Sequence, residues 1–84
     1  MLDNNKNVVS QNVRLFRTRC GMTQSDLAAR LQTLGVNLDQ QMISKIEHNT
    51  RMVTDYELAC LCSILRVSPN EMLADFIKSR RADA

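Results

Sequence analysis

The chain has 84 residues, of which 44% are hydrophobic, and it carries a formal net charge of +2. A chain of this length builds one small domain and leaves little room for the deep pocket that most enzymes need. Glycine and proline are scarce, with two and one respectively, and no stretch alternates apolar with polar residues for long. These features predict an all-α fold.

The charge is uneven along the chain. Residues 1–51 carry a net charge of +3, whereas residues 52–84 carry a net charge of −1. A basic surface can attract a polyanion such as DNA, although the same charges are also typical of a solvated helix face. Composition alone therefore permits nucleic-acid binding without requiring it.

The cysteines and the polar N-terminus predict a cytoplasmic protein with reduced thiols. There are three cysteines, an odd number, and no apolar leader segment precedes them. Cys60 and Cys62 are two residues apart, so on a helix they point about 200° apart and cannot bind one metal ion together. No apolar run approaches the ~18 residues of a membrane span. We therefore expect no metal site, no cofactor and no membrane segment.

Residues 1–6 are polar and rich in asparagine, which predicts a flexible arm. Lys6 in this arm can contact DNA, or the arm can be frayed and without a role. A helix is expected over residues 7–20, and Gly21 can end it in a left-handed conformation. Apolar side chains recur on one face of this helix at Val9, Val13, Phe16 and Cys20.

A second helix is expected from Thr23 to residue 33 or 34, with Gly35 as its C-terminal stop. Thr23 and Asp26 have the spacing of a capping box, in which each side chain accepts a hydrogen bond from the other residue's backbone N–H. The connector that follows should tuck its apolar side chains under the core, and these are Val36 and Leu38.

A third helix is expected over residues 39–48. Asp39 is a favourable N-cap, because its carboxylate lies at the positive end of the helix. Gln40 and Gln41 then occupy an exposed first turn, and Lys45 faces outward one turn later. The side chains expected to face the core are Ile43 and Ile46.

Two further helices are expected. Thr54 and Glu57 have capping-box spacing at the start of the fourth helix, and the fifth begins at residues 68–71, SPNE, where proline follows a cap residue. Their apolar side chains are Leu58, Leu61, Ile64 and Leu65, then Met72, Leu73, Phe76 and Ile77. Residues 79–84 should form a flexible tail, which leaves residues 7–78 as the folded domain.

Short pieces spread over these helices resemble one known family. In chain order they are Gly21-Met22-Thr23-Gln24, Leu27-Ala28, Ile43-Ser44-Lys45-Ile46-Glu47, Glu57-Leu58 and Val67-Ser68-Pro69-Asn70-Glu71-Met72-Leu73. Each piece alone is weakly specific, but together and in this order they resemble the Cro/CI-type (XRE-like) helix-turn-helix family over about residues 10–77. The resemblance implies an all-α, five-helix, lambda-repressor-like domain whose second and third helices bind double-stranded DNA.

The resemblance also implies which residues act at the site. Those that it assigns to DNA binding are Gln24, Gln40, Gln41, Ser44, Lys45 and Arg51. Gln24 and Arg51 correspond to phosphate contacts, and the first turn of the third helix corresponds to contacts with base edges and backbone. Arg17 and Glu47 match two positions that form a structural ion pair in family members.

The side-chain chemistry allows these roles but also allows plainer ones. A glutamine amide can donate to N7 of adenine and accept from its N6 group at once, so Gln40 and Gln41 suit base contact. The plainer interpretation is two exposed polar residues in a helix first turn. Lys45 can bind phosphate or a guanine edge, or remain a solvated lysine. Gln24, beside free N–H groups at a helix start, suits a phosphate.

The connector between the second and third helices departs from the family pattern. A glycine usually stands four residues after the position of Ala28, whereas this chain has Gln32 there. The spacing from Ala28 to Ile43 is also about five residues longer than in the family. The insertion should lengthen the second helix or loop outward, and it affects which side chain of the third helix reaches deepest.

These observations predict a sequence-specific DNA-binding transcriptional regulator, expected to be a repressor, that reads the major groove with helix 39–48. A homodimer on a palindromic operator is the expected form. The alternative is an antitoxin-like or other protein-interaction module with secondary DNA binding, for which Met52, Tyr56 and the final helix are candidate surfaces. An enzyme is not expected, because His48 has no nucleophile-and-base constellation around it.

Overall fold

The computed structural model describes residues 5–82, and within this range the chain forms helices and no strands. The helices are α1 (Ser10–Arg19), α2 (Gln24–Thr33), α3 (Gln40–Glu47), α4 (Asp55–Leu65), α5 (Pro69–Met72) and α6 (Ala74–Ala82). The prediction of an all-α fold is confirmed for these residues. Among the described residues, no helix combines the length and apolar character that crossing a membrane requires.

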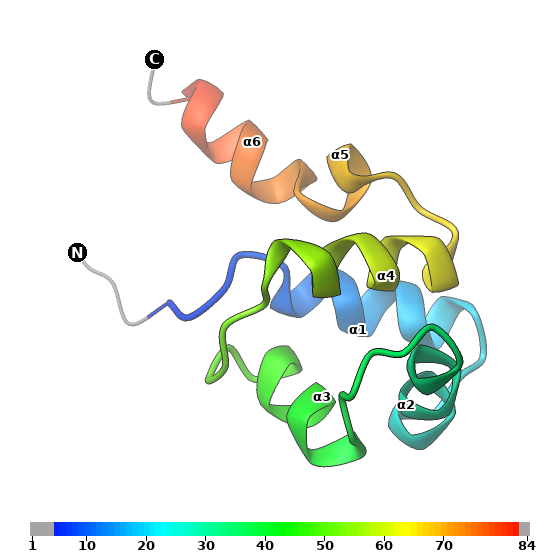
Figure 1. Ribbon diagram of the computed structural model, residues 1–84. Helices are drawn as coiled ribbons and strands as arrows, with labels where there is room; N and C mark the ends of the chain where they lie inside the picture. The colour runs from blue at the N-terminus through cyan, green and yellow to red at the C-terminus, as the bar shows by residue number, and fades with distance from the viewer. Residues whose placement is uncertain (1–4, 83–84) are drawn as a thin grey trace.

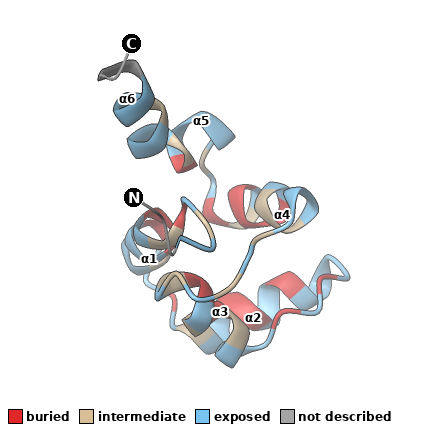
Figure 2. Ribbon diagram, turned by 90° about the vertical axis from the view of Figure 1, so that its left-hand side faces the viewer, coloured by how far each residue is buried: buried red, intermediate tan, exposed pale blue. Residues whose placement is uncertain are grey.

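Helices α1 to α4 share one apolar core. Both α1 and α2 pack against α3 and α4, and the buried positions lie on the sides of these helices that face one another (Figure 2). Burying a leucine or isoleucine side chain stabilises a fold by about 1.5–3 kcal/mol, so this core holds the α2–α3 pair in place. The largest fully buried side chains are Val13, Leu27, Leu31, Leu38, Ile43, Ile46, Leu61 and Met72.

The connector between α2 and α3 forms a loop that is anchored in the core. The helix α2 ends at Thr33, and Gly35 has a φ of +78° that reverses the chain. The backbone N–H of Val36 then donates to the carbonyl of Leu31 at 3.0 Å, which closes the end of α2. Val36 and Leu38 are buried, as the sequence predicted. The insertion therefore carries α2 past Gln32, where the family has its glycine, to Thr33, and its remaining residues form a loop that is anchored in the core by Val36 and Leu38.

The capping residues predicted from the sequence are confirmed at three helix starts. Complete capping boxes join Thr23 to Asp26, Thr54 to Glu57, and Ser68 to Glu71. The hydrogen bond from the Thr23 backbone N–H lowers the pKa of Asp26, because it stabilises the ionised carboxylate. The same arrangement at Ser68 lowers the pKa of Glu71.

The first helix begins later than predicted. It was expected from residue 7, but α1 begins at Ser10. Asn7 does not cap or extend the helix along its axis, because its side-chain nitrogen donates to the backbone carbonyls of Ile46 and Arg51. A tertiary contact with residues about forty positions away therefore takes the place of the local helical hydrogen bonds.

The single fifth helix expected from the sequence is divided into α5 and α6. Leu73 ends α5 with φ −99° and ψ 7°, and α6 leaves in another direction (Figure 1). The Met72 carbonyl, which a continuous helix would offer to the next turn, accepts instead from Asn12 Nδ2 at 2.9 Å. Residues 79–82, predicted to belong to a flexible tail, continue α6, and residues 83–84 lie outside the described range.

Candidate nucleic-acid interface

Helix α3 has one side in the core and a polar N-terminal end at the surface. Ile43 and Ile46 are fully buried, and the Asp39 side chain caps the helix by accepting from the backbone N–H of Met42 at 2.8 Å. This anchoring leaves Gln40 and Gln41 exposed in the first turn. The lengthened connector does not cover them.

A side-chain hydrogen bond joins the first turns of α2 and α3. The Ser25 hydroxyl lies 3.0 Å from Gln40 Oε1 and donates to it. Since the carbonyl oxygen of this amide has a partner, both N–H groups of Gln40 remain for an external acceptor. Sequence reasoning missed Ser25, because its contact joins two helices fifteen residues apart and no local spacing rule marks it.

Glu47 links the end of α3 to α1 and α2. Arg17 Nε lies 2.6 Å from Glu47 Oε2, and Arg17 Nη2 lies 3.0 Å from Glu47 Oε1. The hydrogen bond to Glu47 raises the pKa of Arg17, and burial only partly opposes this effect. Arg17 Nη1 also donates to the carbonyl of Met22 at 2.8 Å. The two residues that the resemblance paired are thus in bidentate contact.

Gln24 belongs to the same network. Its Nε2 donates to Glu47 Oε1 at 3.1 Å, and the side chain is half-buried at the start of α2. An amide nitrogen carries two N–H groups, so one remains for a phosphate. Gln24 therefore holds the start of α2 against the end of α3, in addition to the phosphate contact that the resemblance assigns to it.

Arg51 is engaged in an ion pair that the sequence reasoning did not foresee. Its Nη1 and Nη2 lie 3.0 and 3.2 Å from the two carboxylate oxygens of Glu57. Burial raises the pKa of Glu57, but the hydrogen bonds from Arg51 and from the Thr54 backbone N–H outweigh it and give a net lowering. A phosphate would have to compete with Glu57 for this guanidinium. Glu57 had been interpreted only as a capping residue.

Lys45 and Ser44 lie further along α3. Lys45 is exposed and Ser44 is half-buried. His48 folds back over this turn, with its Nδ1 2.7 Å from the Ser44 carbonyl oxygen. Because a carbonyl accepts, Nδ1 carries the hydrogen in this contact. The structure thus places Gln40, Gln41 and Lys45 at the surface of one helix, with Ser44 between them.

Comparison with known proteins agrees with this geometry. A family model described as helix-turn-helix matches residues 13–72, a range that includes the whole α2–α3 pair. A search of curated proteins found no match. The family match covers well over half of the chain and supports a DNA-binding regulator in general. The chain therefore belongs to the Cro/CI-type (XRE-like) helix-turn-helix family of DNA-binding transcription regulators.

Proposed function

We propose that this protein is a cytoplasmic, sequence-specific repressor that reads the major groove of double-stranded DNA with the first turn of α3. The observation that carries the proposal is the pairing of exposed Gln40 and Gln41 with a fully buried Ile43 on one short helix. A helix held by its apolar side, with a free polar N-terminal end, has the shape and chemistry of a recognition helix.

The roles differ among the side chains of this surface. Gln41 has the amide geometry for bidentate recognition of adenine. Gln40, whose oxygen accepts from Ser25, presents N–H donors that suit guanine N7 and O6 or a phosphate oxygen. Lys45 suits a phosphate or a guanine edge, and Ser44 suits the sugar–phosphate backbone. Gln24 suits a phosphate through its remaining N–H.

We infer that two copies bind together. One helix of this size contacts only a few base pairs, so a homodimer whose α3 helices lie about one duplex turn (~34 Å) apart would give the specificity that a regulator needs. A palindromic operator follows from the two-fold symmetry of such a pair. Selection of bound sequences from a random DNA pool tests both points, because a dimer selects a symmetric site.

The binding surface itself is tested with a matched pair of variants. Fluorescence anisotropy on the selected site should show a loss of at least tenfold in affinity for Gln41→Ala combined with Lys45→Ala. The control combines Gln11→Ala with Arg14→Ala, which removes one amide and one cation from exposed positions of α1. Equal affinity of the two double variants, or no binding by the unaltered protein at low salt, would contradict the proposal.

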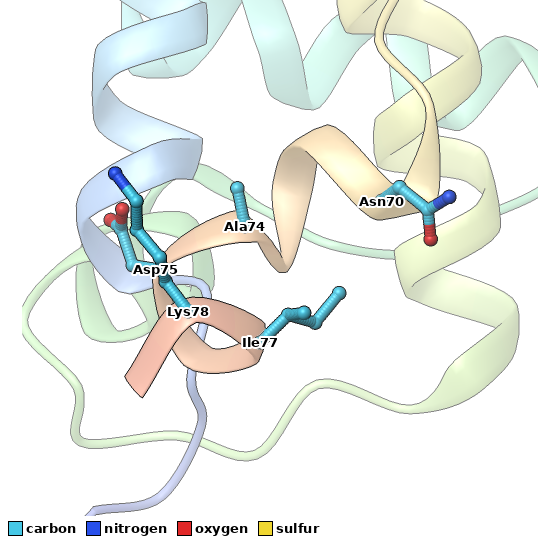
Figure 3. Close-up of a pocket in the computed structure, with 5 residues that line it drawn as sticks. All are labelled: Asn70, Ala74, Asp75, Ile77 and Lys78. Carbon is cyan, nitrogen blue, oxygen red and sulfur yellow. The ribbon is translucent and has the colours of Figure 1, made fainter. Parts of the chain in front are cut away.

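A second candidate function is an antitoxin-like protein-interaction module with secondary DNA binding. Two observations favour it. Met52 and Tyr56 are 66% and 61% exposed, although their side chains are large and apolar or aromatic. A hollow of about 410 Å³ also lies against α5 and α6, lined by Asn70, Ala74, Asp75, Ile77 and Lys78 (Figure 3).

Figure 3 shows Asp75 and Lys78 together on one side of this hollow and Ile77 on the side toward Asn70, so the surface is part charged and part apolar. Stable co-purification with the product of a neighbouring gene, abolished by Met52→Ser with Tyr56→Ser or by Ile77→Asp, would favour this candidate. A free protein whose DNA affinity falls steeply with salt favours the repressor.

A further inference from the structure

The segment before α1 is hydrogen-bonded to the end of α3. Asn49 Oδ1 accepts from the backbone N–H groups of Lys6 at 2.8 Å and of Asn7 at 2.9 Å. In return, Asn7 Nδ2 donates to the carbonyls of Ile46 at 3.0 Å and of Arg51 at 2.9 Å. We call this reciprocal arrangement the Asn7–Asn49 clasp.

The partners fix the orientation of both amides in the clasp. Backbone N–H groups can only donate and backbone carbonyls can only accept, so neither amide can be turned over without losing its bonds. Asn7 Oδ1 also accepts from the backbone N–H of Val9 at 3.0 Å. Asn49 adopts a φ of +59°, a left-handed conformation that asparagine tolerates. Asn49 is therefore suited to the clasp by conformation as well as by bonding.

We propose that the clasp makes Lys6 part of the DNA interface, as a phosphate contact beside the end of α3, with Asn7 and Asn49 as positioning residues. The inference rests on the proposed DNA-binding function. Lys6 is exposed, and its backbone nitrogen is bonded to a side chain two residues beyond the end of α3. The backbone of Lys6 is thereby held beside this helix end, so its ammonium group extends from a fixed point near it.

Hydrogen-bond donors cover several carbonyls at the C-terminal end of α3. The C-terminal end of a helix carries a partial negative charge, which by itself repels an anion. Here several of its carbonyls have donors: Asn7 Nδ2 bonds the Ile46 carbonyl, His48 Nδ1 bonds that of Ser44, and Thr50 bonds that of Lys45. Because these carbonyls already accept hydrogen bonds, they repel a phosphate less and compete less for the ammonium group of Lys6. That group therefore remains available to a phosphate.

The backbone of Lys6 also lies near that of Arg51, the residue to which the resemblance gave a phosphate contact. The Arg51 guanidinium is held by Glu57, so its charge is largely compensated. The Arg51 carbonyl is bonded to Asn7, the residue next to Lys6. The clasp thus holds the backbone of a second cationic residue close to Arg51, whose own charge is paired with Glu57.

The test measures how DNA affinity depends on salt. Each phosphate contact contributes about −0.9 to the slope of log K against log salt concentration on duplex DNA. We expect Lys6→Ala to reduce the magnitude of this slope by about 0.9 per bound chain, with an affinity loss that is the same for the selected site and for unrelated DNA. Lys78→Ala, which removes an exposed lysine from α6, should leave the slope unchanged.

The positioning role has its own readout. Asn49→Gly keeps a residue that adopts positive φ readily but removes the clasp side chain. In this background Lys6→Ala should produce no further change in slope, whereas in the unaltered protein it does. If Asn49→Gly does not fold, as judged by its thermal unfolding, Asn7→Asp replaces it, because a carboxylate cannot donate to the two carbonyls.

The outcomes separate the inference from the function on which it rests. A protein that binds its selected site with the same slope with and without Lys6 overturns the inference and leaves the repressor proposal intact. An equal effect of Lys6→Ala with and without the clasp overturns the positioning role. Failure of the unaltered protein to bind DNA overturns the proposed function.

Discussion

Arg17 and Glu47 form a bidentate ion pair that joins α1 to the last residue of α3, with N–O distances of 2.6 and 3.0 Å. The Glu47 side chain is only 3% exposed, and it also accepts from Gln24. One carboxylate thus joins three helices around the candidate DNA-binding surface.

The first prediction concerns this pair. Glu47→Ala should lower the free energy of unfolding by roughly 3 kcal/mol, because it leaves the Arg17 charge without its partner in a largely buried position. Urea denaturation measures the change. Arg17→Met combined with Glu47→Leu should recover part of the loss, since apolar side chains of similar size replace both charges, while the Met22 carbonyl and the Gln24 amide lose their partners. A loss below about 1 kcal/mol for Glu47→Ala would contradict this account.

The second prediction concerns acid stability. The pKa of Glu57 is lower in the folded protein than its ordinary value of 4.5, so the folded state favours the ionised carboxylate. Its contribution to stability is complete above pH about 4.5 and is lost as the pH falls through the lowered pKa. Unfolding measured between pH 3 and 7 should show this loss. Glu57→Gln should flatten that part of the curve but leave the part due to other carboxylates.

The third prediction concerns the connector. Leu38→Ala should lower the free energy of unfolding by about 2–4 kcal/mol, because Leu38 is 1% exposed and its removal opens a cavity. Leu34→Ala is the matched control, since Leu34 lies in the same loop and is 43% exposed. Its effect should stay within about 1 kcal/mol. Similar losses for the two variants would show that the loop is not anchored as described.

The fourth prediction concerns base specificity and depends on the proposed function. Ser25→Ala removes the donor to Gln40 Oε1 and frees that amide to turn. Repeated sequence selection should then return a broader base preference at the position read by Gln40, with an unchanged salt dependence. Ser63→Ala, at an exposed position of α4, should leave the preference as it was. An identical selected site for Ser25→Ala would remove Ser25 from the recognition mechanism.

Local spacing explains the features that could be predicted from the sequence. The capping boxes at Thr23 and Thr54 join residues three apart, and Gly35 ends α2 through its own backbone freedom. The inward sides of the helices mostly follow from apolar periodicity, although Cys20 and Phe76, which it also predicted to face inward, are exposed. The contact between Arg17 and Glu47 came from the resemblance, since no spacing rule links residues thirty positions apart.

The features that could not be predicted depend on tertiary partners. Asn7 looks like a helix residue until its bonds to Ile46 and Arg51 are known. The division after Met72 depends on Asn12 bonding its carbonyl from another helix. For Arg51 the resemblance implied only a phosphate, and the ion pair with Glu57 was not foreseen because it depends on how the turn before α4 folds.

The anchored connector has a consequence for how the protein tolerates change. Because Val36 and Leu38 are buried on either side of Asn37 and the Asp39 side chain caps α3, the chain just before α3 is fixed while Asn37 itself faces solvent. The exposed Asn37 is therefore a natural attachment point for a fluorescent label or a short peptide tag. Such a reporter would lie close to the candidate DNA-binding surface and should leave the orientation of α3 unchanged.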